Sequence, residues 1–294
     1  MGKKILLTGS SGFLGSHILQ YLLKKKIKVF DILKKKRINK KLNKKLAHNF
    51  KNYQPIFYNS HNDLEKKLEK IKVDIVIHCA TFYSLGEDYK TILKLINSNL
   101  IFSLLILKNS IINCKKFINF GSMMEFAPSK LPPKNIYAVT KICFEKFLSF
   151  YSNKNINTKI YNIKLFETYG DNDKRKKIIP TLIKNYANNK NFLLFSKKLC
   201  MNFIHVNQVI NFIDKLIFKN INSGSYCLRN DKFIKISEML KSLNFNLKRK
   251  IKIKYFNKSS NQQKNNNFNL KIILSKNNIE DYLYSKLKKF DSKK

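Results

Sequence analysis

Apolar positions in the first half of the chain alternate between two patterns. Short apolar runs predict strands at residues 4–7, 28–32, 56–58, 73–78, 116–120 and 159–165. Apolar residues at helical spacing predict helices at residues 13–23, 89–112 and 137–151. Strands that alternate with helices in this way form an α/β fold with a parallel, doubly wound sheet.

The pattern changes after about residue 165. Strands become shorter, and connections rich in Lys and Asn become more frequent. We therefore expect a first domain at 1–165 and a smaller, mainly substrate-binding lobe at 166–294. A predicted helix at 207–218 would return to the first domain, within a stretch of about 203–218. Residues 259–269 are polar and rich in Asn and Gln, which favours a loop.

A glycine-rich turn, TGSSGFLG, separates the first predicted strand from the first helix. Gly9 allows a tight turn, Gly12 lets backbone N–H groups approach a pyrophosphate, and Gly15 lets the helix pack close to the sheet. The GxxGxxG spacing differs by one residue from the commonest dinucleotide-binding turn. Because the N–H dipoles of a helix converge at its first turn, this context predicts a Rossmann-type NAD(P) domain.

The second predicted strand ends at Asp31, which lies 22 positions after Gly9. A carboxylate there can bind the adenosine ribose and would repel the 2′-phosphate of NADP. A basic run follows at Lys34, Lys35, Lys36 and Arg37. It favours NADP or simply forms a solvated loop. The expected cofactor is therefore NAD or NADP, with a slight preference for NAD.

Tyr137 and Lys141 are four residues apart at the start of a predicted helix, so their side chains share one face. A free phenol has a pKa of about 10, and a neighbouring ammonium would lower this pKa. Ser122 follows the strand at 116–120, at the carboxyl end where parallel sheets bind ligands. Its hydroxyl would bind a carbonyl or alkoxide oxygen while Tyr137 transfers the proton. A chance YxxxK match and a turn role for Ser122 are the alternatives.

Four motifs together resemble the extended short-chain dehydrogenase/reductase family, the NAD-dependent epimerase/dehydratase group: TGSSGFLG, IHCAT at 77–81, GSMMEFA at 121–127 and YAVTK at 137–141. The resemblance implies catalytic roles for Ser122, Tyr137 and Lys141. It implies cofactor contacts by Gly9, Gly12, Phe13, Leu14, Gly15, Asp31, Cys79, Ala80, Thr81, Tyr137 and Lys141.

Two downstream segments extend the resemblance to about residue 215. They are LFETYG at 165–170 and NFIHVNQV at 202–209. Substrate contacts are expected from Ser122, Phe166, Thr168 and Arg175. Arg175 could pair with a nucleotide diphosphate or lie on the surface.

The resemblance also places the family's helix asparagine at Asn97 or Asn99. Asn99 is preferred, because Ser103 stands where the family usually has a Thr. In the LFETYG segment, Glu167 replaces the family's usual Asn, so substrate contacts at that position are in doubt.

Met123 and Met124 follow Ser122 where dehydratases of the family carry Asp-Glu. Thioethers cannot exchange protons, so dehydration is disfavoured. The segment at 165–183 looks most like enzymes related to CDP-abequose and CDP-paratose synthases, which are nucleotide-sugar 4-reductases. That resemblance implies hydride transfer at sugar C4, with Tyr137 as the proton donor. The alternatives are a nucleotide-sugar C4 epimerase and a noncatalytic NAD(P)-binding regulator.

The net charge of +41 suggests nucleic acid as a partner, but only four of the 59 basic residues are Arg. Nucleic-acid readers favour Arg for its bidentate geometry, so a solvated Lys-rich surface explains the charge and no specific nucleic-acid partner is expected. The five cysteines show neither paired nor zinc-like spacing, which indicates a reducing compartment and no metal site.

No signal peptide or membrane-spanning segment is expected, which makes the cytoplasm the default location. The family often dimerises through a four-helix bundle. Here the bundle would use 89–112 and 137–151, although core packing would explain the same apolar faces. The expected partner is a nucleotide-sugar substrate.

Overall fold

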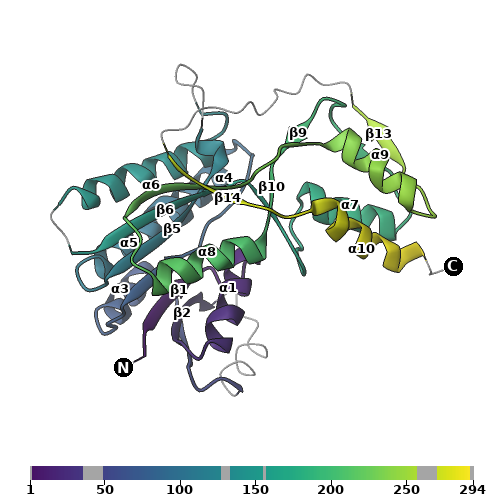
Figure 1. Cartoon of the computed structure of the whole chain (residues 1–294). Coiled ribbons are helices and arrows are strands. Elements are labelled where there is room, and N and C mark those ends of the chain that lie inside the picture. Colours follow the sequence, from purple (N-terminus) through teal and green to yellow (C-terminus); the bar gives the residue numbers. More distant parts are fainter. Residues whose placement is uncertain (1, 36–48, 127–132, 155–156, 257–269, 292–294) are drawn as a thin grey trace. The chain divides into compact units, whose positions relative to one another are not determined.

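A computed structural model describes residues 2–35, 49–126, 133–154, 157–256 and 270–291 (Figure 1). Three parts of the sequence analysis concern residues outside these ranges. They are Lys36 with Arg37, Ala127, and the polar stretch at 259–269.

An eight-stranded sheet in the order β14-β11-β6-β5-β4-β1-β2-β3 forms the core of the fold (Figure 1). Its strands are β1 (Lys4–Thr8), β2 (Lys28–Lys34), β3 (Tyr53–Tyr58), β4 (Ile75–His78), β5 (Lys116–Ser122), β6 (Lys159–Leu165), β11 (Gly224–Asn230) and β14 (Lys271–Ser275). All pairs from β3 through β6 are parallel. This confirms the predicted α/β fold. Strand order reverses between β1 and β4, so the expected ligand crevice lies at their carboxyl ends.

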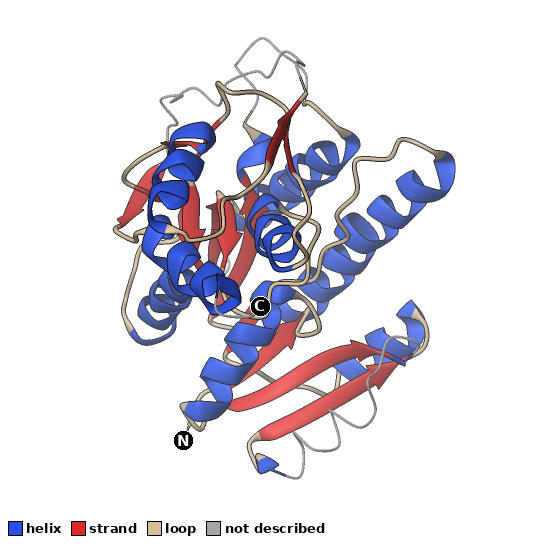
Figure 2. Ribbon diagram, turned by 90° about the vertical axis from the view of Figure 1, so that its right-hand side faces the viewer, coloured by secondary structure: helices blue, strands red, loops and turns tan. Residues whose placement is uncertain are grey.

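Helices cover both faces of the sheet (Figure 2). The helices of this part are α1 (Phe13–Lys24), α3 (His61–Leu68), α4 (Tyr89–Ile96), α5 (Phe102–Ser110), α6 (Ile136–Ser152) and α8 (Val206–Phe218). Helices α3, α5 and α6 bury Leu64, Phe102 and Phe144 in one apolar cluster that also holds Leu6 of β1. Because side chains alternate along a strand, the neighbours of Leu6 face the opposite side, where α1 packs on β1 and β2.

Two short helical segments interrupt the regular pattern. The π-helical segment η2 (Asn97–Ile101) joins α4 to α5, and the 3-10 segment η3 (Met123–Glu125) follows β5. The sequence predicted one uninterrupted helix at 89–112 and no element at 123–125. Both segments carry polar residues of the candidate site.

Backbone contacts divide the chain into two units. The first comprises Met1–Leu165 and Ile210–Cys227, and the second comprises Phe166–Val209 and Leu228–Lys294. The stretch that returns to the first unit is thus 210–227, against about 203–218 expected from the sequence.

The second unit has its own apolar cluster, which includes Tyr169, Leu182, Leu240 and Leu283. Its further elements are β7 (Glu167–Tyr169), α7 (Ile178–Ala187), β8 (Phe192–Leu194), β9 (Cys200–Met201), β10 (Phe203–His205), β12 (Ile234–Lys235), α9 (Ile236–Asn246), β13 (Ile253–Tyr255) and α10 (Ile279–Asp291).

One helical stretch, Tyr89–Ser110, is long and apolar enough to cross a membrane by length and composition alone. The sequence analysis considered uninterrupted apolar runs, so it did not single out this stretch, which carries isolated polar residues. Two of these, Asn99 and Ser103, are buried and contact Thr140 and His78. This stretch therefore contributes polar anchors to the core of the first unit.

Candidate active site

The glycine-rich turn holds the backbone of the β1–α1 connection against the end of β4. Gly9 has a φ of 76°, and a Cβ there would lie 2.6 Å from the Ala80 nitrogen. A Cβ on Gly15 would lie 2.1 Å from the Gly9 carbonyl oxygen. Gly12 is the N-cap of α1 and supplies no capping side chain, so this helix end can present N–H groups to an anion. A turn that only glycine can form fits the pyrophosphate of NAD(P).

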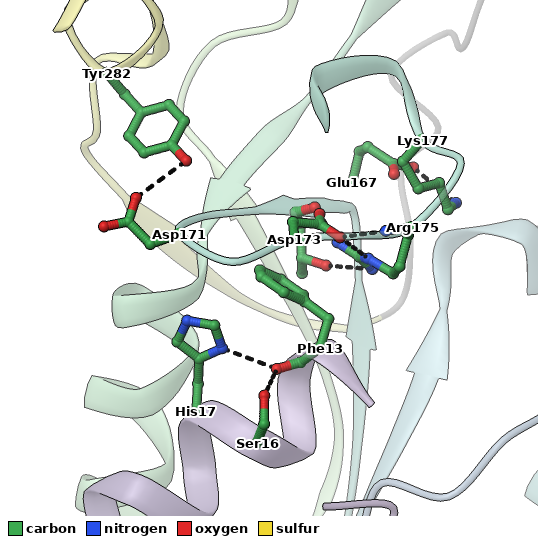
Figure 3. A network of polar contacts seen from close by, with 10 residues as sticks. Phe13, Ser16, His17, Glu167, Asp171, Asp173, Arg175, Lys177 and Tyr282 are labelled. Atoms are coloured by element: carbon green, nitrogen blue, oxygen red, sulfur yellow. Dashed lines mark hydrogen bonds and ion pairs between the residues drawn. The ribbon is translucent and has the colours of Figure 1, made fainter. Parts of the chain in front are cut away.

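The two apolar residues of this turn begin α1. Phe13 and Leu14 are both partly buried. The Phe13 carbonyl oxygen accepts a hydrogen bond from the Ser16 hydroxyl at 2.9 Å and lies at the same distance from His17 Nδ1 (Figure 3). These contacts fix the first turn of α1, where the family resemblance places the pyrophosphate.

Asp31 lies within β2 and not at its end, because the strand continues to Lys34. Its Oδ2 accepts hydrogen bonds from the Ser10 hydroxyl at 2.7 Å and from the Tyr53 hydroxyl at 2.9 Å. Burial raises the pKa of Asp31 to about 6, although both hydrogen bonds act in the opposite direction. The prediction that Asp31 ends the strand was therefore wrong, and Asp31 anchors the glycine-rich turn through Ser10.

Ser122 is the last residue of β5 and the N-cap of η3. Its Oγ accepts a hydrogen bond from the Met124 N–H at 3.1 Å. Its own N–H donates to the Glu125 carboxylate, which completes a capping box. The Ser122 hydroxyl is thus held at the carboxyl end of the sheet, where the sequence places it.

Tyr137 is buried in the first turn of α6, which begins where the Asn135 side chain caps the Ala138 N–H at 2.8 Å. Its ring packs edge-on against Tyr83, with centroids 5.0 Å apart. Burial raises the pKa of Tyr137, and the nearby Glu125 charge acts in the same direction. Hydrogen bonds with the Thr81 and Ser122 side chains act the other way. The structure thus brings the hydroxyls of Tyr137, Ser122 and Thr81 together.

Lys141 is buried one helical turn after Tyr137. Its Nζ donates to the Phe120 carbonyl oxygen at 2.7 Å. Burial lowers the pKa of Lys141, against the opposing effect of Glu125. The expectation that Lys141 lowers the Tyr137 pKa does not hold in this structure, where burial and Glu125 dominate and raise it.

Asn99, and not Asn97, faces this site. Asn99 Oδ1 accepts hydrogen bonds from the Thr81 hydroxyl at 3.0 Å and from the Phe82 N–H at 2.8 Å. Its Nδ2 donates to the Phe82 carbonyl oxygen and to the Thr140 hydroxyl. Asn97 is exposed and bonds only within its own helix, to Leu93. The structure thus places Asn99, the residue preferred in the sequence analysis, beside Thr81 and Thr140.

The segment after β4 lines the same end of the sheet. The Ala80 N–H donates to the Thr8 hydroxyl at 3.2 Å, and Thr81 binds Asn99. Burial raises the pKa of the Cys79 thiol, which therefore stays protonated. Behind this segment, His78 lies 2.9 Å from the Thr8 hydroxyl, and burial lowers its pKa to about 3. A neutral imidazole thus ties β4 to β1.

Phe166, Thr168 and Arg175 belong to the second unit. The Phe166 ring packs edge-on against Phe233. The Arg175 guanidinium forms a two-bond contact with Asp173, at 2.8 and 2.7 Å, and donates to the Thr168 carbonyl oxygen at 2.7 Å (Figure 3). Much of the donor capacity of Arg175 is therefore used within its own unit. A diphosphate would have to compete with Asp173.

Sequence reasoning missed a buried charged cluster next to Ser122. Glu125 contacts Lys164 of β6, and Lys164 contacts Glu145 of α6. The S-x-x-E spacing at 122–125 is a capping-box pattern and could have pointed to Glu125. No sequence pattern links residues 125 and 164, because the sheet brings them together.

Residues 5–226 match the family described as "NAD dependent epimerase/dehydratase family". The match covers the glycine-rich turn, Ser122 and the Tyr137–Lys141 pair. The chain therefore belongs to this family, and it is an enzyme of the extended short-chain dehydrogenase/reductase type.

Two relatives sharpen the comparison. A "CDP-abequose synthase" of Yersinia pseudotuberculosis is 30% identical over 227 residues, 76% of this chain and 75% of the relative. A second protein of that name, from Salmonella muenchen, is 25% identical over 77% of this chain and 74% of its own length. In fold, the chain resembles a UDP-glucuronic acid 4-epimerase from Bacillus cereus solved with NAD, with a TM-score of 0.76 and 22% identity, covering 97% of this chain and 96% of the other.

Proposed function

We propose that this enzyme is an NAD(P)H-dependent nucleotide-sugar 4-ketoreductase. The observation that carries the proposal is the pairing of a buried, protonated Tyr137 with the Ser122 hydroxyl at the carboxyl end of β5. A protonated phenol is the form that donates a proton to a developing alkoxide. The similarity to two CDP-abequose synthases supports the same chemistry.

The residues of the first unit have distinct tasks in this reaction. When bound, the reduced nicotinamide supplies the hydride that adds to the C4 carbonyl carbon of the sugar. Ser122 donates a hydrogen bond to the carbonyl oxygen, and Tyr137 donates the proton that converts the alkoxide to an alcohol. Lys141, one helical turn after Tyr137, binds the Phe120 carbonyl oxygen and can bind the cofactor ribose.

Met123 and Met124 distinguish this site chemically from the site of a dehydratase. Water loss requires an acid and a base near the sugar, and neither thioether exchanges protons. The carboxylate that follows, Glu125, has only 1% of its side chain exposed and faces the Ser122 N–H. It therefore does not supply the missing acid.

The expected substrate is a 4-keto nucleotide sugar of a polysaccharide pathway, and CDP-4-keto-6-deoxyglucose is the first to test. Purified enzyme should oxidise one NAD(P)H for each keto-sugar reduced. Tyr137→Phe should lower the rate by about 10²–10⁴. The matched control is Tyr151→Phe, the same change later on the same helix. Equal rates for wild type and Tyr137→Phe would refute the assigned role of Tyr137.

A C4 epimerase is the second candidate, because the folds of 4-epimerases match this chain over nearly its full length. An epimerase interconverts UDP-hexoses without net cofactor consumption. If the keto-sugar is not reduced but UDP-hexose epimers equilibrate, the epimerase function replaces the reductase. Cofactor binding without either activity would indicate a regulator.

For the cofactor, the family supports NAD, and we propose that NADP competes. The anionic Asp31 was the reason to favour NAD, but its carboxylate is buried within β2. Lys34 and Lys35 are exposed at the end of the strand. Titration of intrinsic fluorescence with NADH and NADPH would give both dissociation constants. A clear preference for NADPH would assign the end of β2 to the 2′-phosphate.

We also propose that two copies of the chain pair through α4, α5 and α6. Exposed apolar side chains on this surface include Ile101 of η2 and Phe147 and Phe150 of α6, at 45%, 41% and 52%. They border a groove of about 550 Å³ that also contains Leu104 and Leu105. Light scattering should report a dimer for the wild type and a monomer for Phe150→Glu. A monomeric wild type at micromolar concentration would refute this interface.

A further inference from the structure

A buried charged cluster lies directly behind the candidate catalytic serine. Glu125 Oε2 is 3.3 Å from Lys164 Nζ, and Lys164 Nζ is 2.7 Å from Glu145 Oε2. The Lys164 side chain is 7% exposed and that of Glu125 is 1% exposed. Buried charges are costly unless they are paired, so the cluster needs each of its members.

Among the described residues of this cluster, Glu125 is the one that contacts Ser122. Its Oε1 accepts the N–H of Ser122, and its charge acts on both Tyr137 and Lys141. Glu145 is on the far side of Lys164, where it accepts hydrogen bonds from Asn162 and Ser225. The two carboxylates thus share one lysine, but they differ in their access to the reacting groups.

The backbone makes room for Glu125. A Cβ on Gly121 would lie 2.7 Å from Glu125 Oε1 and 3.1 Å from the Lys164 side chain. Glycine at position 121 therefore lets the carboxylate approach the end of β5. The absence of a side chain at Gly121 thus lets the charged cluster pack against the end of β5.

The charged and titratable groups around Tyr137 come from several elements. Glu125 belongs to η3, Tyr83 follows β4, and Lys141 lies on α6 with Tyr137. Behind Glu125 are Lys164 of β6 and Glu145 of α6. Both Glu125 and Tyr83 oppose ionisation of Tyr137. Glu125 is therefore the carboxylate whose charge opposes ionisation of the Tyr137 phenol.

We propose that Glu125 is a positioning residue that fixes Ser122 and holds a buried negative charge close to the proton-donating Tyr137. This inference rests on the proposed reductase function. Reduction of a ketone uses the protonated phenol as its proton donor, whereas oxidation of an alcohol begins with the phenolate. Glu125 thus widens the pH range over which Tyr137 can act as a proton donor.

The variant that tests this is Glu125→Gln, with Glu145→Gln as its matched control. Both remove one carboxylate from Lys164 and leave the other in place, so each keeps a partner for the buried ammonium. Only Glu125→Gln removes charge next to Ser122 and Tyr137. Circular dichroism and cofactor binding establish that each variant folds.

The first measurement is the amide resonance of Ser122 in full-length protein labelled with ¹⁵N-serine, assigned with Ser122→Ala. Glu125→Gln should move this resonance upfield, because a neutral acceptor replaces a carboxylate. Glu145→Gln should leave it in place. An unmoved resonance in Glu125→Gln overturns the proposal, whatever the activity.

The second measurement is the ultraviolet titration of the Tyr137 phenolate with saturating NAD, isolated by subtracting the matching Tyr137→Phe protein. The phenolate should appear at lower pH in Glu125→Gln, by on the order of one pH unit. An equal or higher midpoint overturns the proposal.

In turnover, the rate of reduction in Glu125→Gln should fall at a lower pH than in wild type. An identical pH profile counts against the proposal. If no keto-sugar is reduced by wild type, the proposed function fails. The two spectroscopic measurements still decide the role of Glu125.

Discussion

Lys141 is bound to the backbone of Phe120 by a hydrogen bond of 2.7 Å between Nζ and the carbonyl oxygen. Phe120 is two residues before Ser122 on β5. The buried ammonium of α6 therefore holds the same strand end that carries the serine. Displacement of that strand end would disturb two of the three candidate catalytic residues together.

Lys141→Met should lower the rate of reduction by about 10²–10³, because the Phe120 carbonyl loses its partner and the strand end that carries Ser122 loses its anchor. Steady-state oxidation of NAD(P)H is the measurement. Lys146→Met, an exposed change on the same helix, is the control and should match wild type. Equal loss in both variants would contradict a specific role for Lys141.

Asn99→Leu and Asn97→Leu form a matched pair two residues apart. Asn99→Leu leaves the Phe82 N–H and carbonyl oxygen without their partner, so we expect a loss of about 2–4 kcal/mol in the free energy of unfolding. Asn97→Leu should stay within about 0.5 kcal/mol of wild type, because Asn97 is exposed. Urea denaturation measures both. Equal stabilities would show that the Asn99 contacts contribute little.

Gly15→Ala should abolish cofactor binding, because its Cβ would collide with the Gly9 carbonyl oxygen and displace the turn. Calorimetric titration with NADH is the measurement. Gly2→Ala is the control, since a Cβ there meets nothing within 4 Å. Wild-type affinity in Gly15→Ala would mean that the cofactor does not bind against this turn.

Asp31→Asn should change the pH dependence of stability. A carboxyl whose folded pKa is raised from 3.8 to about 6 contributes stability that is present below about pH 4 and lost as pH rises through 6. The amide that replaces the carboxyl in the variant does not ionise, so the variant does not lose stability in this way. Its free energy of unfolding relative to that of wild type should therefore rise by about 3 kcal/mol between pH 4 and pH 7. Denaturation across this range is the measurement. Asp231→Asn, a change at an exposed position, is the control for removal of one carboxylate from the chain.

Six of the eight strands of the sheet could be predicted from sequence, because most of these six are apolar runs that bury both faces. Strands β11 and β14 were missed, and β14 is largely exposed. Helix α3 was missed because only Leu64 and Leu68 are buried among its eight residues. The end of β2 was misplaced because the run was taken to stop at Ile32, although Leu33 is also buried. A charged residue inside a buried strand, such as Asp31, looks like a strand end when only the sequence is known.

Sequence analysis could predict the residues of the candidate site that stand at the spacing of a motif. It could not predict the residues that only the folded chain brings together. Ser122, Tyr137 and Lys141 stand at spacings that a sequence displays. The contact of Glu125 with Lys164 joins η3 to β6, so no motif displays it. The lowered pKa expected for Tyr137 was wrong because burial cannot be seen in a YxxxK motif. The charge state of the phenol is a property of the folded site.

The π-helical segment Asn97–Ile101 changes the rotational position of α5 relative to α4. A π turn is in effect one extra residue inserted into an α-helix. The insertion rotates α5 by about 100° relative to an uninterrupted continuation of α4. Removing one residue here would restore regular helix geometry and turn Asn99 away from Thr81. The π-helical turn thus sets the direction in which the Asn99 side chain points, so that it reaches Thr81.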